Sequence, residues 1–350
     1  MLALSAADSV SLAVQRTRDF LFRPFNWGTY LKLGLVAIIT EGSANNFRSS
    51  SGSGHPSRPG PMPDPLFNIS AFKIAAAVAA CLLALLLVMW IYYLVTRLRF
   101  AFFHCMTSNT KEIRPGWHFY RQPATRFFWL NVIVGLCFLL VAVVVSIPFV
   151  TGFWRLFHAI PPGGHPDIAL LLSLILPLIP LVLLFVLAGI LIDVVLRDWM
   201  LPHYAVDNAS AGEAWSAVWN AVTAEKKQFF VYALLRLVLP IVAMVVLFMV
   251  LLIPGLIVAG SIGALVYALH SAFAASTGGA AVAGLIVQGF FGAVGFLLML
   301  LAGICLGGPI STGIREYALT FYGGRYQALG DLLYPPAAPP PPASRASVIA

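Results

Sequence analysis

Charge is what this sequence has least of. Only 10% of its 350 residues are Asp, Glu, Lys or Arg, whereas 60% are hydrophobic. A typical soluble domain is about 25% charged and about half apolar. The apolar residues here form runs that reach the roughly 20 residues needed to cross a hydrocarbon layer about 30 Å thick. The composition therefore excludes an ordinary soluble fold and predicts an all-α, polytopic membrane protein.

Recognisable catalytic and metal-binding motifs are also missing. The sequence contains no HExxH, GxSxG, GxxxxGKS/T or paired CxxC. Its four cysteines lie in or beside apolar runs without paired spacing, which is typical of small buried residues. Of the seven histidines, His158 and His165 could meet across a turn, but neither has the spacing of a metal pair on one helix face. We therefore expect no enzyme activity, no cofactor and no metal site.

Nucleic acid is not an expected partner, although the net charge is +8. The basic residues sit in short clusters beside the apolar runs, where they meet anionic lipid headgroups. Arg16, Arg18 and Arg23 precede the first run, and no small-residue cleavage site follows it. We therefore expect no signal peptide, and we expect the bilayer and a lipid headgroup as partners.

The apolar runs predict six spans, with 1–330 forming one transmembrane domain. Ser, Gly and Pro dominate residues 42–70, which predicts a flexible external loop. The Pro-rich residues 331–350 are expected to form a disordered cytoplasmic tail. Residues 254–280 are apolar enough for a seventh span. The six predicted spans are about 27–40, 72–95, 128–150, 168–196, 229–253 and 281–309.

One unit occurs three times along the chain. An interfacial segment rich in aromatic or basic residues leads into a span, an external connection follows, and a second span ends in charge. Ile147-Pro148 and Ile253-Pro254 end the first spans of the second and third copies. This parallel favours three helical hairpins with interfacial helices, and it favours an external interfacial segment at 254–280 over a seventh crossing.

Orientation follows from the distribution of Lys and Arg. With the N-terminus inside, the predicted cytoplasmic segments hold 15 of the 21 basic residues and the external loops hold 3. Such a bias is what the positive-inside rule expects. We therefore predict a multi-pass protein of the cell membrane with both termini in the cytoplasm.

A few charged residues lie in or near the spans, where each costs at least about 2.5 kcal/mol on insertion scales. They could form a cytoplasm-facing cluster that binds a lipid headgroup or an ion. They could instead be structural, with Asp193 pairing with Arg197 at i,i+4 and Arg236 pairing with an acid of another hairpin or snorkelling. The candidates for this cluster are Asp193, Arg197, Arg236, Arg315 and Glu316.

The leading functional prediction is a non-enzymatic protein that binds, passes or organises lipid or small solutes. The alternative is a membrane-embedded enzyme acting on lipid headgroups at the cytoplasmic face, with a site built where acids and histidines converge. Residues available for such a site are His104, His118, His203, Asp193, Asp198, Asp207 and Glu213. Gly303 and Gly307 form a GxxxG that suits close helix packing, either within the monomer or in an oligomer.

A family resemblance rests on the entry Phe22-Arg23-Pro24-Phe25-Asn26-Trp27, the charged hairpin ends and the closing Arg315-Glu316-Tyr317. Over residues 11–330 the pattern resembles the bacterial membrane domain that in some proteins precedes a glycerophosphodiester phosphodiesterase domain, and related stand-alone membrane families of unknown function. The resemblance implies a bundle of helical hairpins in a bacterial cytoplasmic membrane. The chain has no room for the soluble phosphodiesterase barrel, so that activity is not implied.

Overall fold

The computed structural model describes residues 5–46, 71–159, 168–273 and 279–335. Every regular element in these residues is helical, which confirms the all-α prediction. The elements are α1 (Asp8–Phe22), α2 (Trp27–Asn46), α3 (Ala71–Thr107), α4 (Ile113–Phe119), α5 (Arg121–Ala159), α6 (Ile168–Val194), the π-helical segment η1 (Val195–Met200), α7 (Leu201–Val206), α8 (Ala211–Ala224), α9 (Lys226–Phe273), α10 (Gly279–Gly323) and α11 (Gln327–Leu333).

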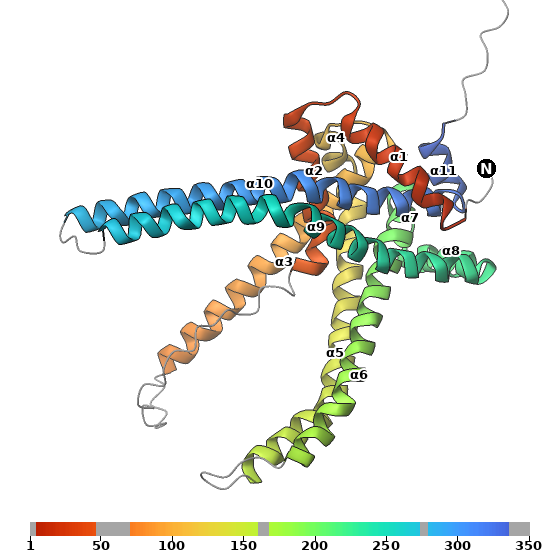
Figure 1. The fold of residues 1–350 in the computed structure, drawn as a ribbon. Coiled ribbons are helices and arrows are strands. Elements are labelled where there is room, and N and C mark those ends of the chain that lie inside the picture. Colours follow the sequence, from red (N-terminus) through yellow and green to blue (C-terminus); the bar gives the residue numbers. More distant parts are fainter. Residues whose placement is uncertain (1–4, 47–70, 160–167, 274–278, 336–350) are drawn as a thin grey trace, which may run out of the picture.

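The long helices form arms that diverge from a common base (Figure 1). One arm is α3, the second is the pair α5 and α6, and the third is the pair α9 and α10. The short helices α1, α2, α4, α7, α8 and α11 gather around the base, where the described chain both begins and ends. A short helix, α1, α4 or α8, precedes each of α2, α5 and α9. Repetition of sequence among the three units remains a prediction.

Five helices are long and apolar enough to cross a membrane, namely those that contain α3, α5, α6, α9 and α10. The most apolar part of each has no buried residue. Leu83, Leu139 and Leu183, for example, are at least 58% exposed. Such surfaces are stable only against hydrocarbon, since water would leave each exposed leucine unfavourably hydrated. The first predicted span, 27–40, is not among these five: it corresponds to α2, a 20-residue helix that lies against α10 instead of extending an arm.

The base is a packed core rich in aromatic rings. Helices α3 and α10 run beyond their predicted spans into this core, α3 to Thr107 and α10 to Gly323. Phe127 packs edge-on against Phe100 and Tyr204, with ring centroids 5.6 and 5.3 Å apart. Edge-to-face pairs of this kind stabilise a core beyond the area they bury. Arg197, Arg315 and Glu316, which lie near predicted span ends, are therefore buried within this core.

The prediction of a separate interfacial segment at 254–280 is wrong for the described part, because α9 continues through Pro254 to Phe273. A proline lacks only one intrahelical hydrogen bond, and apolar helices tolerate it where neighbours compensate. The same continuation occurs in α5, which passes Pro148 and ends at Ala159. With α9 at 48 residues, its length is about 70 Å, far more than one hydrocarbon layer requires.

The predicted external loop 42–70 begins too early, since α2 extends to Asn46. The charged Glu41 does not end that helix, because its side chain has cationic partners in the base. The rest of this loop lies outside the described residues, as do residues 336–350 of the predicted tail.

Helices α2 and α10 cross at glycine. A Cβ on Gly308 would lie 2.7 Å from the Cα of Gly34, so the two backbones touch. The two glycines of the GxxxG motif, Gly303 and Gly307, have different surroundings. Gly307 faces Ile38 of α2, and a Cβ on Gly303 would have no described atom within 4 Å. Close packing within the monomer therefore centres on Gly308, and the use of Gly303 and Gly307 in an oligomer remains a prediction.

Candidate functional site

Asp198 lies at the centre of a charged cluster in the base. It belongs to the π-helical segment η1, and its side chain is fully buried. Its carboxylate accepts hydrogen bonds from the Tyr232 hydroxyl (2.8 Å) and from Arg236 Nε (2.8 Å). The Nη1 atom of Arg315 lies 3.4 Å from the same carboxylate. Three residues from the α9–α10 arm thus converge on one acid that follows α6.

Glu41 of α2 is the second buried acid. Its carboxylate lies 3.1 Å from Arg236 Nη2 and 3.3 Å from Arg197 Nη2. Arg197 also lies 3.3 Å from Asp193, one turn earlier on the same chain. We call Glu41, Arg197, Asp198, Arg236 and Arg315 the hub. Through the hub, α2, η1, α9 and α10 are joined by charge.

Burial raises the energetic consequence of losing any of these ion pairs. Moving an ion out of water has an effective cost of several kcal/mol, which attraction to a well-placed partner must offset. The hub holds three arginines and two acids, and the half-buried Asp193 adds a third negative charge at its edge. The cluster is therefore close to neutral as a unit. Removing one member leaves an uncompensated charge inside the protein.

Local backbone geometry explains how two neighbours both face inward. Arg197 and Asp198 are consecutive and both are buried, and they lie in a single turn of π-helix. The wider turn of a π-helix changes the direction of side chains relative to an α-helix, and such turns are frequent at functional sites. No sequence signal that we used distinguishes this π-turn from the end of an ordinary span.

The structure places four of the five sequence candidates together: Asp193, Arg197, Arg236 and Arg315. Glu316 lies apart from them, because it points to α1 and lies 3.2 Å from Arg16. The i,i+4 pairing of Asp193 with Arg197 and the pairing of Arg236 with acids of other helices are both present. Glu41, Asp198 and Tyr232 were not predicted members of this cluster, and Asp198 was named only for the enzyme alternative. A charge directly after the first apolar run was the available signal for Glu41.

The acids and histidines proposed for an enzyme site do not converge as a group. His203 and Asp207 do meet, at 3.7 Å, and His203 Nε2 lies 2.8 Å from the Tyr322 hydroxyl. The Tyr326 hydroxyl donates to Asp207. Elsewhere, His104 stacks on Phe119 in the α3–α4 region. Among the described residues, no group of three or more His, Cys, Asp and Glu could hold a metal ion.

Glu213 is also used locally instead of joining a site. It closes a capping box at the start of α8, in which the Ser210 amide donates to Glu213 at 2.7 Å and the Glu213 amide donates to the Ser210 hydroxyl. This capping satisfies backbone donors at the helix start. The hydrogen bonds from Ser210 lower the pKa of the Glu213 carboxyl.

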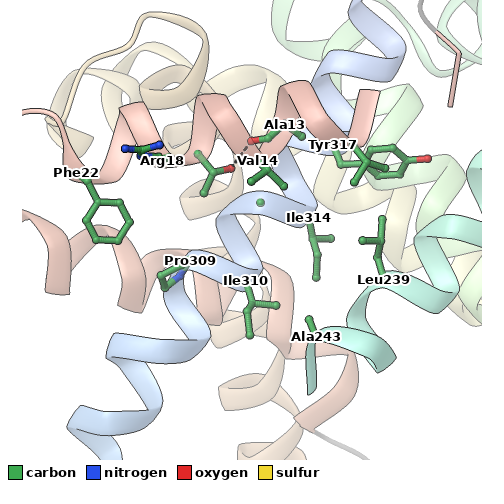
Figure 2. Close-up of a pocket in the computed structure, with 13 residues that line it drawn as sticks. Ala13, Val14, Arg18, Phe22, Leu239, Ala243, Pro309, Ile310, Ile314 and Tyr317 are labelled. Carbon is green, nitrogen blue, oxygen red and sulfur yellow. Dashed lines mark hydrogen bonds between the residues drawn. The ribbon is translucent and has the colours of Figure 1, made fainter. Parts of the chain in front are cut away.

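An apolar groove lies beside the hub, between α1, α9 and α10 (Figure 2). Its volume of about 350 Å³ falls within the range of small-ligand sites, about 300–1,000 Å³. Helix α1 covers one side, and α10 forms the other from Pro309 to Ile314. Thr17, Arg18 and Tyr317 are the lining residues with polar side chains. Arg18 lies near one end, on the same helix as Phe22.

Long, exposed apolar helices that extend from a base with a buried charged cluster define a helical membrane protein. Its family is shown directly: the chain belongs to the Family of unknown function (DUF7544), whose model matches residues 4–332. Comparisons with curated proteins and with solved structures give no match.

Proposed function

We propose that this protein is a non-enzymatic membrane protein that binds and organises lipid, with lipid filling the space between its arms. The observation that carries the proposal is the divergence of the arms from a common, packed base (Figure 1). The most apolar stretches of these helices are entirely unburied. Lipid chains are as apolar as leucine, so such helices gain little by leaving lipid for one another.

The arms offer little support for a solute pathway. A pathway for polar solutes requires polar groups along the pore or cavity. Asn131 uses its side-chain amide to donate to the Phe127 carbonyl of its own helix, at 2.7 Å. Gln288 is the other isolated polar residue of a predicted span, and its neighbours along α10 are apolar residues and glycine. These features favour lipid contact over transport of polar solutes.

The hub supports the same proposal as a mechanical element. Its ion pairs join α2, η1, α9 and α10. A separate hydrogen bond, from Arg126 of α5 to the Asn208 side chain at 3.1 Å, joins α5 to the segment that follows α7. The hub fixes the inner ends of these helices relative to one another. Lipid can then occupy the space between their outer parts. Because each hub arginine already lies within 4 Å of a hub acid, we propose a structural role for the hub instead of headgroup binding.

The finer setting is also part of the proposal. We propose that the base lies on the cytoplasmic side of a bacterial cytoplasmic membrane, with both termini inside. The excess of Lys and Arg around the base supports this orientation. The resemblance to the membrane domain fused to glycerophosphodiester phosphodiesterases supports the compartment, and it adds no reaction.

An enzyme acting on lipid headgroups remains the second candidate, because His203, Tyr322 and Asp207 approach one another at the base. A histidine between a carboxylate and a hydroxyl is an arrangement used in nucleophile activation. Against this role, His203 and Tyr322 are buried, at 5% and 1% exposure. If the purified protein turned over phospholipid and His203→Gln abolished this activity, the enzyme would be favoured.

Native mass spectrometry tests the lipid proposal. The full chain is released from nanodiscs of phosphatidylethanolamine and phosphatidylglycerol, and bound phospholipids are counted as the collision energy rises. We expect several phospholipids to remain at energies where the fold is retained. A protein that sheds all lipid while still folded, or that conducts a polar solute across vesicles, would contradict the proposal.

A further inference from the structure

The apolar groove beside α1 has a lining suited to hydrocarbon. Ala13 and Val14 of α1 face Ile310 and Ile314 of α10 across it (Figure 2), and Val10 also lines it. The wall of α9 adds Leu239 and Ala243. Apolar pockets with a small number of placed polar groups are the usual form of small-molecule sites.

Arg18 gives this groove one uncompensated cation. It is exposed, and the described residues supply neither an ion pair nor a hydrogen bond for its guanidinium. Two neighbouring arginines, Arg16 of α1 and Arg23 just after it, differ in this respect. Arg16 pairs with Glu316 at 3.2 Å, and Arg23 pairs with Asp19 at 3.3 Å. An anion at this end of the groove would therefore meet Arg18 without displacing an existing partner.

Helix α1 also has the position of an interfacial helix. Its buried face includes Ala13, Thr17 and Phe20, while Val14 and Phe22 remain exposed at 62% and 44%. It lies across α10 at the base, where the apolar arm begins. Helices that mix arginine with apolar residues in this way reside at the boundary between headgroups and acyl chains.

We propose that the groove binds one anionic phospholipid, with an acyl chain along α1 and α10 and its phosphate at Arg18. This inference rests on the proposed lipid-binding function and assigns it one specific site. The acyl chain alone provides little preference, because the surrounding bilayer is equally apolar. Selection therefore comes from the headgroup, through the attraction of Arg18 to a lipid that carries net negative charge.

Arg18→Gln tests the headgroup contact. In nanodiscs of phosphatidylcholine with a minority of phosphatidylglycerol, native mass spectrometry of the wild type should show phosphatidylglycerol enriched among retained lipids. Because a basic residue near the surface contributes about 1 kcal/mol to anionic-lipid binding, the variant should lose about fivefold of that preference. Arg23→Gln is the matched control, since Arg23 directly follows α1 and already has an acidic partner.

Gly313→Leu tests the acyl-chain contact. A Cβ at Gly313 would meet Thr17 at 3.6 Å, an ordinary contact, and Gly313 lines the groove, so a larger side chain there takes up groove volume. We expect this variant to fold and to lose the most tightly retained lipid. Gly303→Leu, on the same helix but outside the groove, should retain it.

Photolabelling locates the lipid. Phosphatidylglycerol with a diazirine in its acyl chain should label Val14, Ile310 or Ile314, and Gly313→Leu should abolish this labelling. Labelling confined to the arms, with several lipids still bound, would overturn the groove assignment and leave the proposed function intact. Crosslinks from the groove to a second copy of the chain would also overturn it. A folded protein that retains no lipid at all would overturn both.

Discussion

Replacing Asp198 by alanine is expected to destabilise the fold by about 3–5 kcal/mol, the range for breaking a buried ion pair by removing one partner. The change leaves Arg236 and Arg315 buried without their shared acid and removes the acceptor of the Tyr232 hydroxyl. Thermal or denaturant unfolding of the purified protein, monitored by size-exclusion chromatography, measures the loss of stability.

Asp19→Ala is the matched control for that change. Asp19 forms an exposed i,i+4 pair with Arg23, and exposed pairs contribute about 0–1 kcal/mol. A double-mutant cycle adds a sharper criterion. Asp198→Asn combined with Arg236→Gln removes opposite charges together, so the pair should cost less than the sum of the single changes. Equal stability of Asp198→Ala and Asp19→Ala would refute the hub.

Gly308→Leu is expected to produce the second large effect. A Cβ at this position would lie 2.7 Å from the Cα of Gly34, and backbone cannot yield as a flexible side chain can. Overpacking typically costs about 1–3 kcal/mol, and a clash against backbone belongs at the upper end of that range. Displacement of α2 would also move Glu41 away from Arg197 and Arg236.

The same melting assay, with Gly303→Leu as the control, decides this prediction. A Cβ at Gly303 would meet no described atom within 4 Å, and leucine suits a lipid-facing surface. We expect Gly303→Leu to melt close to the wild type and Gly308→Leu to melt well below it. If Gly303→Leu were the more damaging change, the crossing of α2 and α10 would not be as described.

Apolar run length predicted the arms because length and composition alone decide whether a helix suits a membrane. The helix starts at Trp27 and Ile168 were predicted to the residue. Helix ends were predicted poorly. After Thr40 and Val95 the sequence turns polar, yet α2 and α3 continue, since tertiary partners in the base stabilise the charged side chains. Such partners come from distant segments and leave no local signal.

The site was predictable to a similar degree. Charges close to apolar runs identified Arg197, Arg236 and Arg315, because isolated charge in such places requires a partner. The partners themselves were harder to find. Asp198 follows Arg197 directly and becomes central only through a π-turn, and Glu41 is separated from Arg236 by most of the chain. The groove was invisible in the sequence, since its lining residues come from α1, α9 and α10.

The separation of the arms is the central claim, and double electron–electron resonance in nanodiscs tests it most directly. One spin-labelled pair joins His158 and Ser271, near the outer ends of α5 and α9; another joins Ser108 and Ser216 at the base. We expect a narrow distance distribution at the base and a much longer, broader one at the outer ends. A short, narrow distance between His158 and Ser271 would mean that the arms close into a bundle, and it would contradict a protein that holds lipid between them.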